Sequence, residues 1–436
     1  MTLPRVLVIA YRYPPMMSMG SLRLLNLTAR LREHGFDPLV VTVDPMVGYY
    51  TKTGGLETPE TVRVVRTKDR SLHRAVSGGS ARLRHGASRR ADRSLFEFVP
   101  RALRPLYRLY KRLICFPDEV ILWYVLGYRE IQRIAAKERP SIIYSSALPS
   151  TCHLIASRLS RDLGLPWVAE YRDLWTQNHL WTRPWPLRGI EQRIERRAIH
   201  RASALVTVSS HLADQLRASH DKHVEVIPNG YDEQAPVFPA SAHAPRLRLV
   251  YTGMIYPRTR DPGPIFEGIR TLINEGVLTQ DDVSISFYGR RLDYLKGLIA
   301  SYPELLPCIQ VQGEVPHRVS LDAQRDASVL LLLESTDASA KGVVTGKLPE
   351  YLGARRPILA IAPREGAIAS ILAHTRAGRV AANAEEVAGI LRDWLARLTT
   401  DGEIPYEVDD EAVSRYSWRA QTAKLAKVFN DVLQDG

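Results

Sequence analysis

The sequence has few cysteines and none of the long apolar runs that mark a membrane protein. Its three cysteines, Cys115, Cys152 and Cys308, lie far apart and have no metal-ligand spacing. A disulfide framework or zinc site is therefore not expected, and a reducing compartment fits. No run of about 18 apolar residues is present, so we expect no membrane-spanning helix. The first residues lack the features of a signal peptide, which favours a cytoplasmic location.

Acidic residues are scarce in one part of the chain, and this scarcity explains most of its positive charge. The 436 residues carry a formal net charge of +12. Between Arg66 and Arg112 there are 14 Lys and Arg but 3 Asp and Glu, a local net charge of +11. A concentrated positive field attracts an anionic partner, which could be nucleic acid, anionic lipid or a phosphate-bearing substrate.

Two parts of this basic segment differ in pattern. Residues 70–95 are rich in Arg, Ser and Gly and are predicted to be mobile. Residues 101–114 place apolar and basic side chains on opposite sides of a helix. Such a helix could lie on an anionic membrane surface, with the segment 66–114 as the contact. Alternatively, its apolar side packs on the N-terminal domain and its arginines face solvent.

Short apolar strands alternate with amphipathic helices along the chain. In the first half, the strand-like segments are 5–11, 38–43, 141–146, 166–171, 204–209 and 224–230, and residues 21–35 have helical spacing. In the second half, the strand-like segments are 247–253, 283–289, 308–313, 328–333 and 357–361. This alternation predicts α/β architecture with parallel sheets covered by helices on both faces.

A stretch without periodicity divides the two halves. Residues 231–246 carry Pro, Ala and Ser, as is typical of an interdomain linker. We therefore predict two doubly wound Rossmann-like domains, 1–235 with the basic segment 66–112, and 246–413. A terminal helix is predicted at 414–436, and we expect it to return to the N-terminal domain. Ligands bind beyond the carboxyl ends of such strands, so two facing domains would leave a cleft between them.

The loop after the first strand is a candidate phosphate site. Gly20 and Ser21 open the following helix, where backbone N–H groups and the helix dipole favour an anion. The loop has one glycine and is not the three-glycine dinucleotide fingerprint. A tight turn is the alternative reason for a glycine at this position.

The loop after the first strand of the second half is topologically equivalent. Gly253 turns the chain there, and Arg258 and Arg260 follow. Arginines in a cleft-facing loop could clamp a diphosphate with forked hydrogen bonds. The alternative is that both are solvated surface arginines.

A lysine and a glutamate stand three residues apart before the strand-like segment 357–361. Lys347 could supply a point charge to a diphosphate, and Glu350 could accept hydrogen bonds from two neighbouring sugar hydroxyls. A pair with this spacing is more often a surface ion pair on a helix. Its predicted position, lining the same cleft as the two loops, favours ligand binding.

The segment YRDLW ends a strand of the first half. Arg172 and Asp173 would point from its carboxyl end into the cleft. Asp173 could orient an acceptor hydroxyl, or it could cap the next helix. Trp181 and Trp185 follow around Arg183, where they could stack on a sugar, meet a membrane interface or plug the base of the loop.

Several of these segments together resemble the retaining glycosyltransferases of family 4, which have the GT-B fold. The chain is most similar to bacterial members that build surface polysaccharides or decorate secondary metabolites. The resemblance covers most of the chain and rests on YRYPPMMSMGSLR (11–23), FPDEVILW (116–123), SSALPSTCHLIA (145–156), PWVAEYRDLW (166–175), VIPNGYD (226–232), GEVPHRVS (313–320) and TGKLPEYLGARRPILA (345–360).

The resemblance implies a role for each candidate residue. Arg258 or Arg260, with Lys347, would hold the donor diphosphate, and Gly20 would lie against it. Helix N-termini near Gly20 and Gly346 would also stabilise charge on the departing diphosphate. Glu350 would bind the ribose, and the other donor-binding residues implied are Gly289, Arg290, Val315, Pro316, His317 and Thr345.

On the acceptor side, the resemblance implies Asp173 and Arg172 near the reacting centre, with Trp181 close by. Asp173, Arg260 and Lys347 are the expected catalytic residues. The family usually needs no bound metal, and no Asp-x-Asp motif occurs in a plausible cleft loop. We therefore expect no cofactor apart from a nucleotide-sugar co-substrate.

One position departs from the family pattern. Many members have two glutamates with seven residues between them. Glu350 matches the second, but Gly342 occupies the place of the first, and neighbouring Lys341 is no substitute for an acid. The residues that hold the hydroxyls of the donor sugar are therefore not identified by the resemblance.

The sequence favours a nucleotide-sugar-dependent glycosyltransferase and leaves its acceptor open. The acceptor could be a polyprenyl-linked saccharide at the inner membrane face, which the basic segment would favour, or a soluble molecule. Two other classes are weaker. A nucleic-acid-binding protein would need base-stacking aromatics or a reader motif, and neither is found. A nucleotide-sugar epimerase would share the fold but needs an acid/base pair of carboxylates that the sequence does not offer convincingly.

Overall fold

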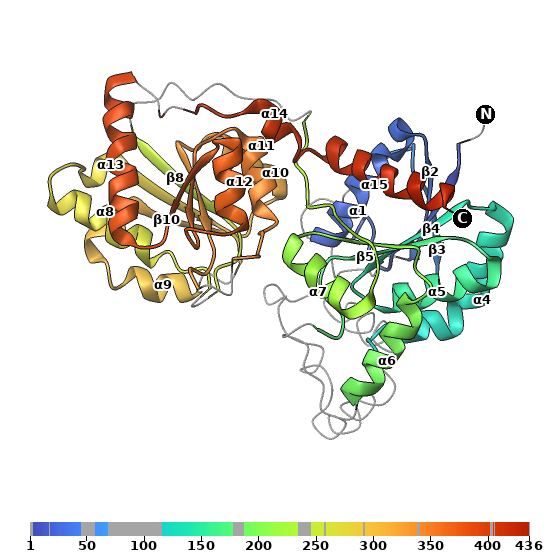
Figure 1. Ribbon diagram of the computed structural model, residues 1–436. Helices are drawn as coiled ribbons and strands as arrows, with labels where there is room; N and C mark the ends of the chain where they lie inside the picture. The colour runs from blue at the N-terminus through green and yellow to red at the C-terminus, as the bar shows by residue number, and fades with distance from the viewer. Residues whose placement is uncertain are drawn as a thin grey trace, which may run out of the picture. The chain divides into compact units, whose positions relative to one another are not determined.

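The computed structural model describes residues 3–16, 18–44, 57–68, 116–177, 187–233, 246–256, 259–290, 293–337, 341–401, 404 and 406–435. Several predicted features lie outside these residues: Arg258, Trp181, and nearly all of the basic segment 66–112 with its helix 101–114. The chain forms two compact units (Figure 1). Unit 1 comprises Met1–Pro228 with Gln421–Gly436, and unit 2 comprises Asn229–Ala420.

Unit 1 is built on a seven-stranded parallel sheet. The strands are β1 (Arg5–Ile9), β2 (Asp37–Val43), β3 (Arg63–Thr67), β4 (Ile142–Ala147), β5 (Trp167–Tyr171), β6 (Ala204–Thr207) and β7 (Val224–Val226). Their order is β3-β2-β1-β4-β5-β6-β7, and every pairing is parallel. The strands β1, β4 and β5 are buried along nearly their whole length because helices cover both faces of the sheet.

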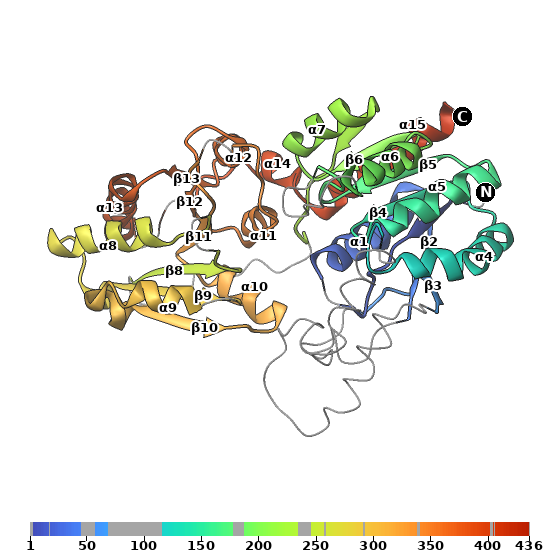
Figure 2. The same cartoon turned by 90° about the horizontal axis from the view of Figure 1, so that it is seen from below.

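Helices cover both faces of the unit 1 sheet. One face packs against α4 (Ile121–Glu138), α5 (Thr151–Leu163), α6 (Leu187–Ile199) and α7 (Ser210–His220) in a single apolar cluster. Figure 2 shows α4 and α5 side by side. On the other face, Phe429 of α15 (Trp418–Gln434) contacts Tyr144 of β4 and Phe36, which follows the helices α1 (Met19–Arg30) and η1 (Leu31–His34). The predicted return of the C-terminal helix to the N-terminal domain is therefore confirmed.

The helix predicted at 414–436 begins slightly later in the structure. It forms α15, which starts at Trp418, and the short helix α14 (Asp410–Ser414) precedes it. Between them, the backbone pairs with Tyr231, which donates to Tyr416 O at 3.0 Å and accepts from Trp418 N at 2.9 Å. These contacts fix the backbone just before α15 begins.

Unit 2 is built on a six-stranded parallel sheet. The strands are β8 (Leu247–Thr252), β9 (Val283–Tyr288), β10 (Ile309–Gly313), β11 (Val329–Leu333), β12 (Ile358–Ile361) and β13 (Gly378–Ala381). Their order is β10-β9-β8-β11-β12-β13. Two parallel α/β sheets confirm the predicted fold class.

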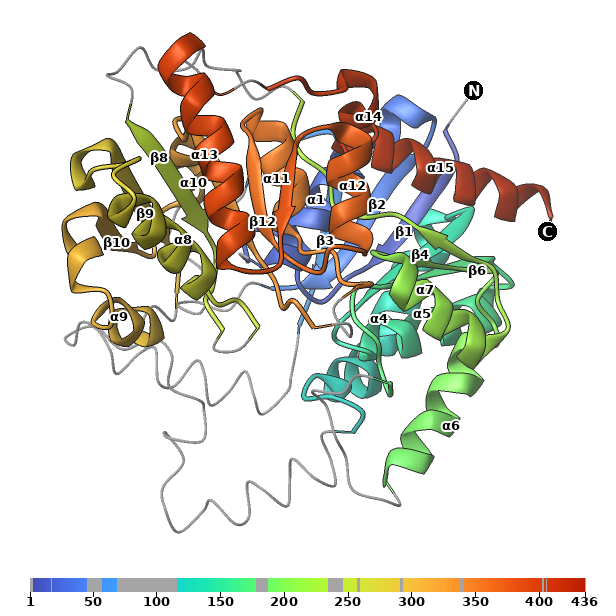
Figure 3. The ribbon, with the colours of Figure 1, turned by 60° about the vertical axis from the view of Figure 1, so that its left-hand side comes forward.

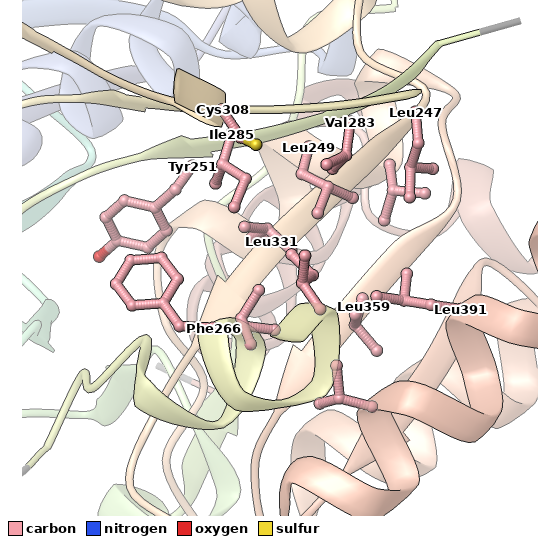
Figure 4. Close-up of a cluster of buried hydrophobic side chains, with 14 of the residues drawn as sticks. Leu247, Leu249, Tyr251, Phe266, Val283, Ile285, Cys308, Leu331, Leu359 and Leu391 are labelled. Carbon is pink, nitrogen blue, oxygen red and sulfur yellow. The ribbon is translucent and has the colours of Figure 1, made fainter. Parts of the chain in front are cut away.

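Alternate residues of the unit 2 strands face two separate helix layers. Leu331 and Leu359 point to the layer of α8 (Gly263–Asn274), α9 (Asp293–Ile299) and α13 (Ala384–Asp401), as Figure 4 shows in close-up. Leu330 and Ile358 point to the layer of α10 (His317–Arg325), α11 (Lys347–Ala354) and α12 (Ala367–Thr375). The helices α8 and α13 lie side by side (Figure 3). Short 3₁₀ helices, η4 (Gln280–Asp282) and η5 (Pro303–Cys308), flank β9 and β10.

Each sheet has one point at which the direction of strand addition reverses. In unit 1 this point lies between β1 and β4, and in unit 2 it lies between β8 and β11. Loops from adjacent strands leave in opposite directions there, so a crevice forms beyond the carboxyl ends. Ligand sites are therefore expected at these two switch points.

Candidate functional site

Polar side chains gather at the switch point of unit 2. Thr252 is the last residue of β8, and Glu334 follows the last residue of β11. The chain then leads into α11, whose first turn carries Lys347 and Glu350. Since the carboxyl ends of parallel strands share one edge of the sheet, these residues lie around one crevice.

Glu350 is a buried carboxylate that accepts hydrogen bonds from two side chains and lies close to a third. Its side chain is 10% exposed, and Lys347 Nζ donates to Oε2 at 2.9 Å. Gln324 Nε2 lies 3.5 Å from the same oxygen, and His317 Nε2 lies 3.5 Å from Oε1. Burial would raise the pKa of Glu350, but Lys347 and His317 outweigh it and lower the pKa to about 2. The Lys347–Glu350 pair is therefore not a solvated surface pair, which was the alternative from spacing alone.

A buried polar network supports Glu350 from behind. Gln324 is fully buried, and its Nε2 donates to Thr252 Oγ1 at 2.9 Å as well as approaching Glu350. Tyr351, also fully buried, accepts from Thr252 N through its hydroxyl at 3.0 Å. These bonds connect α10 and α11 to the end of β8 and fix the position of the carboxylate. Gln324 could not be predicted from the sequence, because a buried amide within a helix has no motif.

Arg260 lies beside a second buried carboxylate. Its Nη2 is 3.6 Å from Glu334 Oε2, and its guanidinium lies over the ring of Tyr256, 5.2 Å from the centroid. The Arg260 side chain is 25% exposed, while that of Glu334 is 9% exposed. Burial raises the pKa of Glu334, and Arg260 offsets only part of that effect. Sequence reasoning missed Glu334, although an acid directly after an apolar strand was a usable signal.

Three glycines end adjacent strands of the unit 2 sheet and bring their backbones into contact. Gly289 N donates to Gly313 O at 2.7 Å, and Gly253 N donates to Tyr288 O at 2.8 Å. A Cβ on Gly289 would lie 1.9 Å from Gly253 O, at a φ of 144°. Only glycine fits at Gly289, so this edge of the sheet presents bare backbone to the crevice.

The remaining predicted donor residues lie on the loops around this edge. Arg290 forms an exposed ion pair with Glu314. Val315 is half-buried and Pro316 is exposed just before α10, which begins at His317. Thr345 is buried, and its hydroxyl accepts from Lys347 N at 3.4 Å. Gly346 caps the N-terminus of α11.

At the switch point of unit 1, Gly20 and Arg172 are in direct contact. Gly20 lies in the first turn of α1, and a Cβ there would be 1.6 Å from Nη1 of Arg172. The glycine is therefore required by the guanidinium that packs against it. Arg172 Nε donates to Ala147 O at 2.8 Å and Nη2 donates to Leu148 O at 2.8 Å. Arg172 thus ties the ends of β4 and β5 to the start of α1.

Residues next to Arg172 are anchored by buried carboxylates. Glu195 accepts from Tyr171 OH at 3.1 Å and from Thr176 N at 3.2 Å, and Glu191 accepts from Trp175 Nε1 at 3.0 Å. Asp173 lies within this anchored loop and is itself exposed. A polar side chain on a fixed loop is suited to contact a ligand.

A fully buried ion pair lies beneath α1. Arg23 Nε donates to Glu170 Oε1 at 2.8 Å, with the side chains 2% and 0% exposed. Arg23 also donates to Ile227 O at 2.7 Å and to Pro228 O at 2.8 Å. Arg23 and Glu170 therefore hold α1 and β5 together with Ile227 and Pro228, which end the first segment of unit 1.

Asp118, in the segment FPDEV, fixes the start of α5. It accepts from Thr151 N at 2.8 Å and from Thr151 Oγ1 at 2.6 Å. Within the described ranges, no group of three His, Cys, Asp or Glu side chains is arranged to hold a metal ion. Every helix in the same ranges is too short or too polar to cross a bilayer.

Several solved glycosyltransferases of the GT-B fold have the same two-sheet architecture. HepE from Anabaena, solved with UDP, is 13% identical; the alignment covers 98% of this chain and 100% of HepE, with a TM-score of 0.64. A sucrose-phosphate synthase from Thermosynechococcus elongatus is 13% identical over 99% and 100% of the two chains, with a TM-score of 0.57. The lipopolysaccharide outer core galactosyltransferase WaaB is 12% identical over 99% of each chain, with a TM-score of 0.53. No curated protein sequence matches the chain.

The family follows from the sequence of unit 1. Residues 21–235 match Glycosyltransferase Family 4, so the chain carries a glycosyltransferase family 4 domain. The whole chain has the GT-B fold, and its first half is a glycosyltransferase family 4 domain. The family match favours the transferase hypothesis. The fold alone does not separate it from the epimerase hypothesis, because a putative UDP-N-acetylglucosamine 2-epimerase from Listeria monocytogenes matches at 11% identity with a TM-score of 0.54.

Proposed function

We propose that the protein transfers a sugar from a nucleoside-diphosphate sugar to a hydroxyl of an acceptor, with retention of configuration and without a metal ion. The observation that carries this proposal is the buried Glu350 carboxylate with Lys347 at the switch point of unit 2. Burial would raise the pKa of Glu350, but Lys347 and His317 lower it to about 2, so the protein keeps a buried carboxylate ionised beside a cation. A cation and an anion side by side suit a ligand with a diphosphate and neighbouring hydroxyls.

The donor diphosphate is held by Arg260 and Lys347, with Arg258 as a further candidate. As the bond between the sugar carbon and the diphosphate oxygen breaks, its electron pair goes to that oxygen and negative charge grows on the leaving group. Fixed cations and the N-terminus of α11 stabilise that charge more than they stabilise the bound donor. These cations take the place of a metal ion, and turnover in excess chelator should therefore equal turnover in its absence.

The nucleoside half of the donor lies along the same edge of the sheet. Glu350 accepts hydrogen bonds from the ribose hydroxyls. The base lies against Val315 and Pro316, and Thr345 and Gly346 approach the phosphates. The bare backbone at Gly289 allows close approach, with Arg290 at the border of the site.

The acceptor is bound by unit 1. Asp173, exposed on an anchored loop, orients the acceptor hydroxyl, and Trp181 contributes an apolar surface. Gly20 approaches the donor diphosphate. Arg172 acts by positioning, because two of its donors already bond to the carbonyls of Ala147 and Leu148.

The donor assignment is tested by a thermal-shift panel on the full chain. UDP, GDP, ADP and dTDP, and the glucose derivative of each, are added at equal concentration. A ligand present at 100 times its dissociation constant stabilises the native state by about 2.7 kcal/mol. The nucleotide with the preferred base binds most tightly, so it should raise the melting temperature more than the other nucleotides at the same concentration. If none of the eight compounds raises the melting temperature, the protein does not bind nucleotide sugars and the proposal falls.

The acceptor is a lipid-linked saccharide at a membrane surface, as the +11 charge between Arg66 and Arg112 suggests. Flotation with vesicles containing anionic lipid should recover the protein at low salt and release it at high salt. Recovery from neutral vesicles should be much lower. If the protein does not float with anionic vesicles at low salt, the acceptor is a soluble molecule instead.

A further inference from the structure

Glu334 is the one acid at the unit 2 switch point without an assigned role. Its backbone N–H continues the sheet ladder, donating to Ile361 O at 2.9 Å. Its side chain is 9% exposed, and Oε1 accepts only from Ser335 N at 3.4 Å. Among the described residues, Oε2 has no hydrogen-bond partner. A buried carboxylate normally satisfies both oxygens, so this one is available to a donor that the protein does not supply.

The neighbourhood of Glu334 defines the kind of group that would bind it. The Arg260 guanidinium lies 3.6 Å away and, under the proposed function, binds the diphosphate. A phosphate oxygen cannot itself approach the Glu334 carboxylate, because like charges repel strongly at a desolvated site. The group that meets Oε2 must therefore be a neutral hydrogen-bond donor attached next to a phosphate. In a nucleotide sugar, that group is a hydroxyl of the transferred sugar.

The sequence explains why such a residue is needed. The resemblance described above implies an acid eight positions before Glu350, but this sequence has Gly342 there. Glycine has no side chain that could bind a sugar hydroxyl. Lys341, beside it, donates to Glu365 Oε2 at 3.1 Å and is directed to that exposed partner. The site therefore has a free carboxylate at the end of β11 and none at residue 342.

We infer that Glu334 is the residue that recognises the donor sugar, accepting a hydrogen bond from one of its hydroxyls through Oε2. This inference rests on the proposed function, since it takes Arg260 as a diphosphate ligand. It makes Glu334 a specificity-determining residue: it acts on the sugar and not on the nucleoside diphosphate. Glu334 lies beside Arg260, which would hold the phosphate, and the transferred sugar is bonded to that phosphate. A hydroxyl of the sugar would therefore lie near Glu334.

The test compares two ligands in two variants of the full chain. The best nucleoside diphosphate from the panel and its glucose derivative are titrated into the wild type, Glu334→Gln and Arg260→Ala. In Glu334→Gln, affinity for the sugar nucleotide should fall about tenfold or more, while affinity for the diphosphate changes less than about twofold. In Arg260→Ala, both affinities should fall together. Glu275→Gln, at an exposed ion pair with Arg392 in the same unit, is the control and should change neither.

One result would contradict the inference and another would contradict the proposed function. If Glu334→Gln lowers or raises both affinities by the same factor, Glu334 acts only through Arg260 and the inference is wrong. If the wild type binds neither ligand, the proposed function fails instead.

A second measurement identifies the sugar hydroxyl and uses a variant that keeps the carboxylate. Deoxy derivatives of the sugar nucleotide, each lacking one sugar hydroxyl, are titrated into the wild type. One of them should bind about tenfold more weakly, and Glu334→Asp, which keeps the charge but shortens its reach, should reduce that penalty. Equal affinity for every deoxy derivative would overturn the inference.

Discussion

The two units share a doubly wound parallel sheet, yet they use charge at the switch point in different ways. In unit 2, the side chains of Arg260 and Lys347 are each 25% exposed and lie beside carboxylates at 3.6 and 2.9 Å. In unit 1, Arg23 is 2% exposed and its donors bond to Glu170 and to two backbone carbonyls. Unit 2 therefore keeps cations accessible, whereas unit 1 encloses its principal cation within the fold.

This difference separates two uses of the same residue type. A fully enclosed arginine is satisfied by the protein, so its removal costs stability. A half-exposed lysine or arginine at a crevice can exchange its protein partner for a ligand, so its removal costs binding. Substitutions at the two switch points should therefore separate stability from affinity, and three substitutions ordered by expected effect sharpen the contrast.

The largest effect is expected for Arg23→Met in unit 1. The substitution leaves Glu170 as a buried charge without its arginine, and such losses cost about 3–5 kcal/mol in free energy of unfolding. Urea denaturation of the full chain measures this. The double variant Arg23→Met/Glu170→Gln should recover part of the loss, because it removes the buried charge as well.

The control for Arg23 is a surface pair of the same unit. Lys427 is 75% exposed and donates to Asp431 at 2.6 Å. The substitution Lys427→Met should cost about 0–1 kcal/mol. If Arg23→Met costs no more than Lys427→Met, the enclosed pair contributes nothing and the contrast between the units fails.

A smaller effect, on binding and not on folding, is expected for Glu350→Gln in unit 2. A hydrogen bond to a charged group contributes about 1.5–3 kcal/mol, so affinity for the preferred nucleoside diphosphate should fall about tenfold to a hundredfold. The wild type should bind a 2′,3′-dideoxy analogue as weakly as Glu350→Gln binds the natural ligand. Glu365→Gln, on an exposed ion pair, is the matched control. Equal wild-type affinity for the natural and dideoxy ligands would show that Glu350 does not contact the ribose.

The smallest effect is a pH dependence located in unit 1. Burial lowers the pKa of His153 from 6.5 to about 3, so the native imidazole stays neutral while the unfolded chain takes up a proton below pH 6.5. The free energy of unfolding should therefore fall as the pH drops from 6.5 towards 3, by at most about 1.4 kcal/mol per pH unit. His153→Asn should reduce the slope between pH 6.5 and 5 by this amount. An unchanged slope would mean that His153 is protonated in the native state.

Glu350 changes the free energy of unfolding in the same direction as His153, but over a lower pH range. Its pKa is lowered to about 2, so it stabilises the native state above pH 4.5, and this contribution is lost as the pH falls from 4.5 towards 2. Its negative charge is therefore present throughout the neutral range, as ribose binding requires.

Strands could be predicted from the sequence where both of their faces are buried. The segments 5–11, 328–333 and 357–361 are continuous apolar runs, and each proved to be a central strand. Two strands were missed: β3, with the sequence RVVRT, and β13, with the sequence GRVA. Both lie at an edge of their sheet. An edge strand keeps polar side chains and lacks the apolar run that marks a central strand.

The candidate site was predictable in its chain positions but not in its contacts. Lys347, Glu350 and Arg260 follow strands, so topology alone placed them at one edge. Burial decides whether a Lys–Glu pair is solvated, and burial of Glu350 depends on residues from α10 that are distant in sequence. The same holds for Gly20, whose glycine requirement comes from Arg172, 152 residues further along the chain.

The central claim is that accessible cations of unit 2 hold a nucleoside diphosphate. Isothermal titration of the preferred diphosphate into Lys347→Ala and Arg260→Ala, with Lys341→Ala as control, tests it most directly. Lys341 lies in the same connection but pairs with exposed Glu365. We predict that each of the first two variants loses at least about tenfold in affinity while the control binds like the wild type. Wild-type affinity in both Lys347→Ala and Arg260→Ala would contradict the account.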